Sequence, residues 1–438
     1  MVQFVRCPMP EILVISYDIL GEKIAGPAIR ALAIAGELTN EFNVSVLYEG
    51  DFQSEKDGIR FINRDSVEIN AGYFNNFDFI LAPPLFTLNF PDLLEFENAL
   101  MVDLFDPVIW ENLVLYRRQS ANMQSFEHER HLAALIAALM RGDYFIAAGR
   151  KQVDLFTGAM MILNRINPET WLEESSVEQM IGYVPFGIPG DPPPSRENSE
   201  LPVEYADIME KKIILWGGGM WDWLDPEIVV RSMPSVLEKV PDAVLVFPGT
   251  DHPNPHIPAM ENVDKIKMLA AKSGLEKHII FGNWMKLKRY RELAVNSSVC
   301  VSAHRYGLES TYAVRTRIIE CIWLGIPQVV SGGDEYSDLL KKYEIGETVC
   351  SRDPANYAEA IITTIEKPVE SFKPGFEKAR FDLSWKSSVE PLREYLKNPR
   401  LTHGTGADFF TDVMGKASPR GKPRDLASIF HRVKSRLK

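Results

Sequence analysis

Cysteine is scarce in this sequence, and long apolar runs are missing. The 438 residues contain 4 cysteines, which lie far apart at Cys7, Cys300, Cys321 and Cys350. No two of them form a CxxC pair, so the pattern fits buried, reduced thiols better than disulfides or a structural zinc site. No apolar run approaches the length of a membrane span, roughly 18 residues, and the start MVQFVRCPMPEILVI does not resemble a signal peptide. We therefore expect a cytoplasmic protein without a bound metal.

Net positive charge is also missing, except near the C-terminus. The formal net charge of −12 argues against general nucleic-acid binding. Residues 416–438, however, carry eight Lys or Arg against one acid. Within them, DLASIFHRVKSRLK has the pattern of a short basic amphipathic helix, which would lie peripherally on the inner face of a membrane. A helix docked on the acidic body, or an unstructured basic end, is the alternative.

Strand-like and helix-like segments alternate along the chain, which is too long for one hydrophobic core. Apolar runs typical of buried strands occur at residues 11–17, 44–48, 77–82, 99–105 and 143–148, and again at 212–216, 243–248, 278–282, 299–303 and 327–331. Helical patterns lie between them. This alternation predicts parallel sheets covered by helices on both faces.

A stretch rich in proline, glycine and polar residues, 187–202, separates the two series. We predict an α/β protein with two doubly wound, Rossmann-like domains and an interdomain cleft at the carboxyl ends of the strands. The expected parts are an N-terminal domain (1–190), a linker (191–202), a C-terminal domain (203–385), a helix that returns to the N-terminal domain (386–400) and a basic tail (401–438).

Three consecutive glycines follow a predicted strand in KIILWGGGMWDWLDP (212–226). A dinucleotide fingerprint beginning at Gly217 would need a glycine at the position of Asp222, and a P-loop would need Gly-Lys-Ser/Thr, so neither motif is present. The turn joins a strand to a helix that begins with Asp225 as its N-cap. A bare glycine backbone there suits a ligand that lies close to the main chain. A tight turn packed by its tryptophans is the alternative.

Polar residues are densest in SAHRYGLESTYAVRTRIIECIWLGIPQVVSGGDEY (302–336). A predicted strand ends before a loop that holds His304, Arg305 and Glu309, and a helix is expected over 310–324.

Two arginines fall in the first turns of that expected helix. Basic side chains are normally unfavourable there because of the helix dipole. An anion such as a phosphate or pyrophosphate that binds at this end would explain Arg315 and Arg317. Alternatively, both arginines pair with Glu320 or with surface acids.

The stretch ECIWLGIPQVV resembles the donor-binding segment of GT-B glycosyltransferases, specifically the retaining enzymes of glycosyltransferase family 4. In that family a loop glutamate and a helix glutamate are separated by seven residues, and the helix ends at a glycine before proline and valines. Glu320 takes the place of the helix glutamate, which holds the ribose hydroxyls. Tyr312 stands eight positions earlier, and the nearest acid is Glu309. Either the loop therefore has a different length, or Glu309 reaches the donor sugar by another path.

Other segments extend the resemblance over most of the chain. GPAIR (26–30) looks like the glycine-containing first loop of the acceptor domain, which implies an acceptor-side role for Gly26. VPFGIP (184–189) resembles the end of that domain, and FDLSWKSSVEPLREYL (381–396) resembles the segment that crosses back to it. The WGGG turn and the RTR helix are similar to those of bacterial family 4 proteins associated with surface polysaccharide.

The resemblance implies a nucleotide diphosphate-sugar as co-substrate, a glycan or lipid-linked acceptor, and no cofactor or metal. The arginine and lysine that hold the donor diphosphate in many family members are missing, and arginines of the 302–336 segment are the inferred replacements. The predicted donor site comprises Gly217, Gly218, Gly219, Trp221, Asp222, Phe281, Asn283, Trp284, His304, Arg305 and Glu320, and the predicted catalytic residues are Glu309, Arg315, Arg317 and Asp106.

The acceptor side is less clearly marked. VDLFDP (102–107) places Asp103 and Asp106 at the carboxyl end of a predicted strand, where either would orient an acceptor hydroxyl. Asp106 precedes a proline and alternatively initiates a turn. His128 and His131 are interpreted as surface or core residues of a helix.

Two other functions share this architecture. A nucleotide-sugar 2-epimerase would use acids and a histidine near the donor sugar, for which His304 and Glu309 are candidates. A degenerate transferase would act as a scaffold or sugar-binding partner, which the displaced glutamate and the missing basic pair favour. Incubation with donor alone separates the epimerase from a glycosyltransferase, because only an epimerase converts a donor without an acceptor. A donor that neither binds nor turns over would support the degenerate protein.

Overall fold

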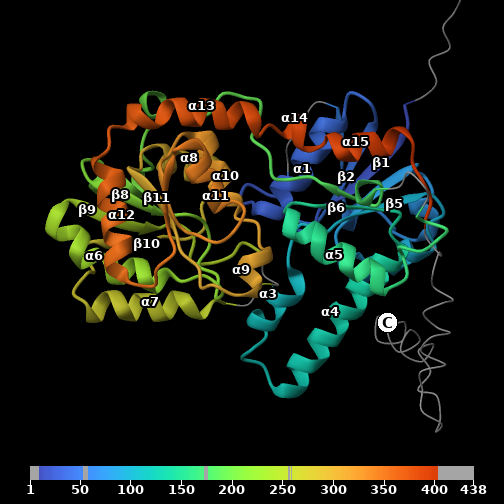
Figure 1. Cartoon of the computed structure of the whole chain (residues 1–438), viewed down its shortest axis with the longest axis horizontal. Helices are drawn as coiled ribbons and strands as arrows, with labels where there is room; N and C mark the ends of the chain where they lie inside the picture. Colours follow the sequence, from blue (N-terminus) through green and yellow to red (C-terminus); the bar gives the residue numbers. More distant parts are fainter. Residues whose placement is uncertain (1–8, 53–57, 172–175, 255–256, 258, 403–438) are drawn as a thin grey trace, which may run out of the picture. The chain divides into compact units, whose positions relative to one another are not determined.

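The computed structural model describes residues 9–52, 58–171, 176–254, 257 and 259–402, and it divides into two compact α/β units (Figure 1). Unit 1 comprises residues 1–20, 27–185 and 389–438, and unit 2 comprises residues 21–26 and 186–388. The predicted tail helix lies outside the described residues.

These units differ from the sequence-based boundaries at both ends of the chain. Residues 21–26 belong to unit 2 and not to the N-terminal domain. The reason is local: the backbone N–H of Leu287 donates to the carbonyl of Glu22 at 3.1 Å, and Lys286 forms an ion pair with Glu22. Near the C-terminus, the division falls between Ser388 and Val389.

Unit 1 is built on a parallel sheet with strand order β3-β2-β1-β4-β5-β6-β7. Its strands are β1 (Glu11–Ile15), β2 (Asn43–Tyr48), β3 (Ile59–Asn63), β4 (Phe79–Ala82), β5 (Ala99–Asp103), β6 (Tyr144–Ala147) and β7 (Ile181–Tyr183). Strands β4, β5 and β6 are buried along their whole length, which is why their sequences are continuously apolar. The sequence analysis missed β3, which is only partly buried, and β7, which has 3 residues.

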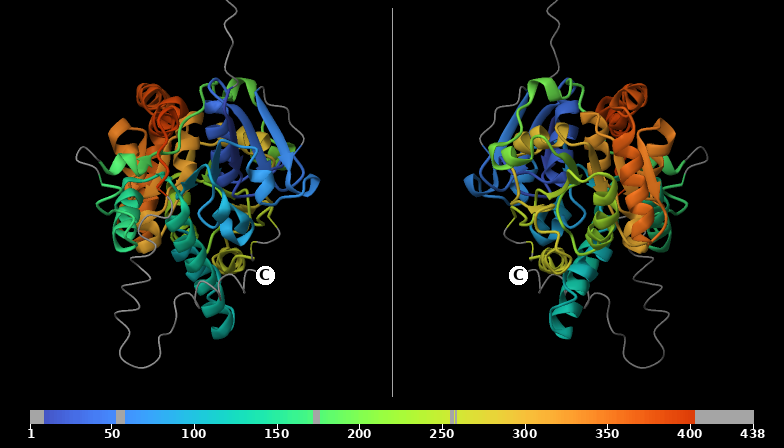
Figure 2. Two further views of the ribbon diagram at one scale, coloured as in Figure 1. Left: turned by 90° about the vertical axis from the view of Figure 1, so that its right-hand side faces the viewer. Right: turned by 90° about the vertical axis from the view of Figure 1, so that its left-hand side faces the viewer.

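Helices connect and flank the strands of unit 1 (Figure 1). They are α1 (Gly26–Leu38), α2 (Ala71–Phe74), α3 (Val108–Leu115), α4 (Ala121–Arg141), α5 (Arg150–Ile162) and α15 (Glu390–Lys397), with 3₁₀ turns η1 (Arg64–Ser66), η2 (Phe86–Leu88), η3 (Pro91–Glu95) and η4 (Val177–Gln179). Helix α4 has 21 residues, begins after the N-cap Ser120, and extends beyond the sheet of its own unit (Figures 1 and 2).

Unit 2 is built on a second parallel sheet, with strand order β10-β9-β8-β11-β12-β13. Its strands are β8 (Lys212–Trp216), β9 (Ala243–Phe247), β10 (Ile279–Phe281), β11 (Val299–Ser302), β12 (Gln328–Ser331) and β13 (Gly346–Val349). The chain builds outward from β8 in one direction and then returns to add β11 on the other side of β8. Doubly wound sheets bind ligands at such a switch point, beside the carboxyl ends of the strands.

The helices of unit 2 cover both faces of this sheet (Figure 1). They are α6 (Pro226–Lys239), α7 (Glu261–Lys272), α8 (Leu287–Val295), α9 (Leu308–Tyr312), α10 (Thr316–Leu324), α11 (Ser337–Tyr343), α12 (Pro354–Glu366), α13 (Lys373–Asp382) and α14 (Trp385–Ser388), with 3₁₀ turns η5 (Arg196–Asn198), η6 (Val203–Ile208) and η7 (Val369–Phe372). Helices α6, α7 and α12 share one apolar core with the sheet, around the buried Trp216 and Phe247. The predicted fold class, two doubly wound α/β domains, is confirmed.

Two local predictions can be compared directly with unit 2. Helix α6 begins at Pro226 with Asp225 in the N-cap position, as predicted, although the Asp225 side chain makes no capping hydrogen bond. Cys300 and Cys321 are buried, but Cys350 is exposed, so the prediction of buried thiols is wrong at that position. Cys350 follows the edge strand β13, where fewer neighbours cover the chain. Cys7 lies outside the described residues.

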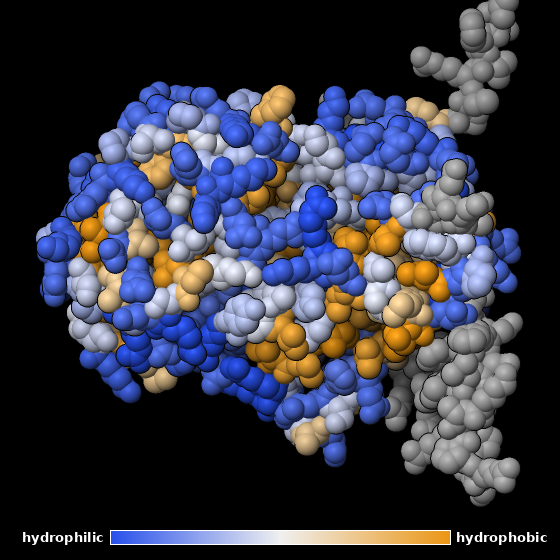
Figure 3. Space-filling view, in the orientation of Figure 1, coloured by the Kyte–Doolittle hydropathy of each residue, from blue (hydrophilic) through white to orange (hydrophobic). Residues whose placement is uncertain are grey.

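Apolar side chains gather on the surface of unit 1 over α3 and α5 (Figure 3). Leu113 is 52% exposed on α3, and Met161 and Ile162 are 59% and 70% exposed at the end of α5. Within the described part of the chain, no helix combines the length and the apolar character needed to cross a bilayer.

Candidate functional site

Strands β8, β9 and β10 end beside one hollow in unit 2. It is open to solvent, and its empty space of about 310 Å³ includes part of that solvent. Its lining comes from the three loops that follow these strands and from three other segments: Gly218, Pro248, Gly249, Trp284 and Met285 from the loops, and Ile24, Leu287, Tyr290 and Arg317 from elsewhere in the unit. The hollow therefore occupies the edge of the sheet where this architecture binds ligands.

The glycine turn makes room for two large side chains of the protein. Gly218 has a φ of +100°, which favours glycine, and a Cβ there would lie 2.9 Å from Nε of Arg317. A Cβ at Gly219 would lie 3.1 Å from the Trp284 ring. Gly217 continues the strand, because its N–H donates to the carbonyl of Val301 at 2.9 Å. The bare backbone thus lets Arg317 and Trp284 reach the hollow.

Arg317 supplies positive charge to the hollow. Its guanidinium carbon lies 4.9 Å from the centre of the Tyr290 ring, and its Nη1 forms an ion pair with Glu320. Burial alone would lower the pKa of Arg317, but Glu320 and Tyr290 raise it above the usual value. The arginine therefore stays charged, and its pairing with Glu320 is the alternative that the sequence had left open.

Glu320 is held between two guanidinium groups. Its Oε1 accepts a hydrogen bond from Nε of Arg291 at 3.3 Å, and its Oε2 contacts Arg317. Arg291 in turn lies over the Trp323 ring, 4.6 Å from its centre. Each carboxylate oxygen can accept more than one hydrogen bond, so Glu320 retains capacity for ligand hydroxyls.

The helix predicted over 310–324 is two helices. Helix α9 ends at Tyr312, residue Ala313 is extended, and α10 begins at Thr316 after Arg315 in the N-cap position. An ion pair spans the break: Arg315 donates to both carboxylate oxygens of Glu309, at 3.0 Å each, and both side chains are nearly buried. Arg315 and Arg317 therefore have different environments.

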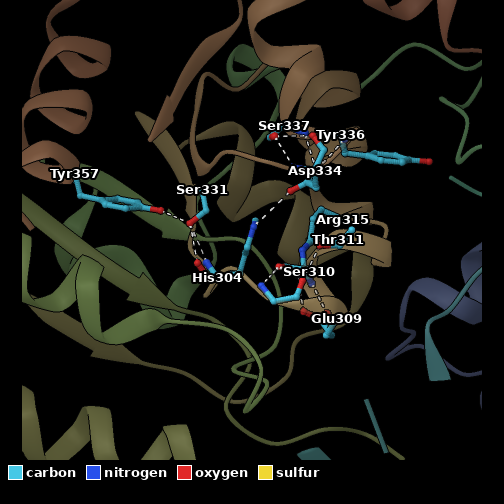
Figure 4. A network of polar contacts seen from close by, with 11 residues as sticks. His304, Glu309, Ser310, Thr311, Arg315, Ser331, Asp334, Tyr336, Ser337 and Tyr357 are labelled. Carbon is cyan, nitrogen blue, oxygen red and sulfur yellow. Dashed lines mark hydrogen bonds and ion pairs between the residues drawn. The ribbon is translucent and has the colours of Figure 1, made fainter. Parts of the chain in front are cut away.

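His304 and Asp334 lie beside this pair, at the carboxyl ends of β11 and β12 (Figure 4). Nε2 of His304 is 3.8 Å from Oδ2 of Asp334, and the two side chains are 5% and 1% exposed. Burial, assisted by the charge of Arg315, lowers the pKa of His304 to about 3. Burial raises the pKa of Asp334, whose Oδ1 accepts backbone hydrogen bonds from the start of α11. His304 is therefore neutral at neutral pH.

The tryptophans after β8 belong to an aromatic cluster. Trp221 and Trp223 stack with ring centres 4.9 Å apart, and His252 lies 5.0 Å from Trp221 and 4.8 Å from Trp284. Asp222 fixes the turn by accepting a hydrogen bond from the N–H of Asn262 at 2.9 Å. Among these rings, Trp284 lines the hollow, whereas Trp221 supports it through His252.

Three further predicted donor residues lie outside the lining of the hollow. Phe281 stacks on Phe247 at 5.3 Å, and Asn283 is exposed. Arg305 is half-exposed, with Nε 3.6 Å from Oδ2 of Asp225. None of these side chains lines the hollow.

The predicted acceptor-side residues have distinct environments. In unit 1, Arg30 is fully buried and binds both carboxylate oxygens of Asp103, at 2.7 and 3.0 Å. This pairing favours a structural role for Asp103 and leaves Asp106 as the acid nearer solvent. Asp106 also contributes to the raised pKa of Tyr17, after burial itself. In unit 2, a Cβ at Gly26 would lie 3.1 Å from Oγ1 of Thr316, so Gly26 lies at the start of α10.

The sequence analysis missed several residues that line the hollow or support it: Ile24, Pro248, Gly249, His252, Tyr290 and Arg291. The Pro248-Gly249 pair, which directly follows β9 (Ala243–Phe247), was an available signal for two of them. Tyr290 carried no signal, since it lies within an ordinary amphipathic helix.

Residues 211–367, which include the hollow except for Ile24, match the sequence model of the family described as glycosyl transferases group 1. A comparison with curated protein sequences finds no match.

Solved structures with a similar fold cover nearly the whole chain. Sucrose-phosphate synthase from Thermosynechococcus elongatus is 15% identical, with a TM-score of 0.57, and the match covers 89% of this chain and 98% of that one. HepE of Anabaena, in complex with UDP-glucose, is 13% identical, with a TM-score of 0.60, and the match covers 89% and 99%. WaaG, a glycosyltransferase involved in lipopolysaccharide biosynthesis, is 13% identical, with a TM-score of 0.54, and the match covers 92% and 100%.

At these identities the similarity establishes a shared fold. The chain has the GT-B fold, and the matched family segment supports a GT-B glycosyltransferase.

Proposed function

We propose that this protein is a retaining glycosyltransferase that moves a sugar from a nucleotide diphosphate to a hydroxyl of a glycan or a lipid-linked saccharide. The observation that carries the proposal is the hollow at the carboxyl ends of β8, β9 and β10, which combines an apolar and aromatic lining with the charged Arg317. Such a lining suits a nucleoside, and the guanidinium suits its phosphates. HepE, with a similar fold, was solved with UDP-glucose, which supports a nucleotide-sugar donor.

Within this proposal, the diphosphate binds beside Arg317 and the glycine turn. Met285 and Leu287 bring the start of α8 to the hollow, and Arg317 lies in the first turn of α10. Helix N-termini and a guanidinium stabilise the negative charge that grows on the leaving phosphate. In this proposal Arg315, which is bound to Glu309, does not contact the diphosphate directly. These cations take the role of a divalent ion, so the reaction needs no metal.

Glu320 accepts hydrogen bonds from the ribose hydroxyls in this proposal, held in place by Arg291 and Arg317. With retention of configuration, the departing phosphate oxygen takes the proton of the acceptor hydroxyl, and no protein base is required. Asp106 is the proposed acceptor-orienting acid. The basic segment 416–438 would hold the protein peripherally at an anionic membrane surface near a lipid-linked acceptor.

The test is a donor and acceptor screen with the full chain. Nucleotide-sugars are incubated with and without hydroxyl acceptors, and the anomeric configuration of any product is read by nuclear magnetic resonance. Acceptor-dependent release of the nucleoside diphosphate with retention supports the proposal. Conversion of the donor alone into a second nucleotide-sugar would establish the epimerase instead. A protein that binds a donor but neither transfers its sugar nor epimerises it would be a sugar-binding partner.

A further inference from the structure

Tyr290 lines the hollow and has a buried hydroxyl with no hydrogen-bond partner among the described residues. The residue lies on α8, is 6% exposed and lines the hollow. Its hydroxyl is buried and has no hydrogen-bond partner among the residues that the structure describes. Buried polar groups are nearly always paired, so an unpaired one needs an explanation. A ligand that brings an acceptor atom would supply the missing partner.

The surroundings of this hydroxyl favour an anionic acceptor. The Arg317 guanidinium lies over the ring of Tyr290, with 4.9 Å from its carbon to the ring centre. Two helices of at least nine residues each, α8 and α10, begin at the hollow. Gly218 also lines the hollow and presents bare backbone next to Arg317. Arg317, although paired with Glu320, and the two helix N-termini thus contribute positive charge on the side of the hollow that Tyr290 lines.

The hydroxyl can act only as a donor to such a ligand. Burial raises the pKa of Tyr290 well above its usual value, although Arg317 opposes the rise. The phenol therefore keeps its proton at neutral pH. A phenol O–H that donates to a charged oxygen forms one of the stronger hydrogen bonds in proteins.

We propose that the Tyr290 hydroxyl donates a hydrogen bond to a phosphate oxygen of the nucleotide diphosphate, next to Arg317. This assignment rests on the proposed function and adds a residue that neither the motifs nor the family segment had marked. Tyr290 then makes the site selective for a phosphorylated nucleoside over the bare nucleoside.

The experiment compares Tyr290→Phe with a matched control, Tyr343→Phe. Phenylalanine keeps the ring under Arg317 and removes only the hydroxyl. Tyr343 lies in the same unit, but its hydroxyl is bonded to Asp382 at 2.9 Å and to Lys342 at 2.8 Å. Calorimetric titration of the full chain with the diphosphates of uridine, guanosine, adenosine, cytidine and thymidine finds the ligand that wild type binds best. Its bare nucleoside is then titrated by nuclear magnetic resonance.

The expected result for Tyr290→Phe is a loss of about tenfold or more in diphosphate affinity, with unchanged nucleoside affinity and no fall in ligand-free melting temperature. Tyr343→Phe should lower the melting temperature and leave both affinities unchanged. Unchanged diphosphate affinity in Tyr290→Phe would overturn the assignment, and so would an equal loss for diphosphate and nucleoside. If wild type binds none of the diphosphates, the proposed function itself fails.

Discussion

The guanidinium carbon of Arg317 lies 4.9 Å from the centre of the Tyr290 ring, and the same side chain packs against the glycine turn. A Cβ at Gly218 would be 2.9 Å from Nε of this arginine. One aromatic ring and one glycine therefore fix the position of the charge in the hollow.

Replacement of Arg317 by alanine should weaken nucleoside diphosphate binding by tenfold or more, because a hydrogen bond to a charged group contributes about 1.5–3 kcal/mol. Binding of the bare nucleoside should change little. Isothermal titration of both ligands measures the difference. The control is Arg231→Ala, which removes an exposed arginine paired with Glu227 on α6. Equal losses of affinity for nucleoside and diphosphate would show that Arg317 supports the fold or contacts the base, not the phosphates.

Arg315→Ala should behave differently from Arg317→Ala. It leaves the nearly buried Glu309 carboxylate without its bidentate partner, and removal of one partner from a buried pair is strongly destabilising, by about 3–5 kcal/mol when burial is complete. We expect a clear fall in the free energy of unfolding, measured by urea denaturation. The double variant Arg315→Ala/Glu309→Ala should recover part of that loss. A stable single variant with abolished diphosphate binding would instead place Arg315 in direct contact with phosphate.

Glu320→Gln should weaken binding of the nucleoside by about tenfold, because a neutral amide replaces a charge-assisted acceptor. Pyrophosphate binding should not weaken, since Arg317 loses a competing anion. Titration with nucleoside and with pyrophosphate separates the two effects. An unchanged nucleoside affinity in a folded variant would exclude Glu320 from the ribose site.

Gly218→Ala should cost stability and also diphosphate affinity. A left-handed alanine costs about 1–2 kcal/mol, and the new Cβ would also displace Arg317. Gly274→Ala is the matched control, because Gly274 has a φ of +66° but no atom within 4 Å of an added Cβ. Both variants should melt lower than wild type, and only the first should lose affinity. Equal affinities in the two variants would show that Arg317 adapts freely.

His304 should make stability fall as the solution becomes acidic. The unfolded chain takes up a proton as pH drops below 6.5, whereas folded His304 does so only near its pKa of about 3. Protonation therefore favours unfolding across this window, by about 2 kcal/mol between pH 6.5 and pH 5. The raised pKa of Asp334 acts in the opposite sense. Urea denaturation at pH 7 and pH 5 should show a smaller loss for His304→Gln than for wild type, and parallel losses would contradict the shift.

Local patterns in the sequence were sufficient for the buried central strands of both sheets, but not for β3, β7 and β13. Strands such as β5 and β9 are buried on both faces, so each needs a continuous apolar run that is visible without any neighbour. The glycine turn and the start of α6 at Pro226 were visible for the same reason, since backbone geometry there depends on adjacent residues.

Only the tertiary structure decided which side chains meet. Nothing in the local sequence indicated that Arg315 pairs with Glu309 across the end of α9, or that Arg30 pairs with Asp103, 73 positions away. Tyr290 became a site residue only because α8 packs against α10 at the end of β8. Ion pairs and cavities of this kind depend on the distances between elements that are remote in sequence, and these distances are fixed when the elements pack, not when they form.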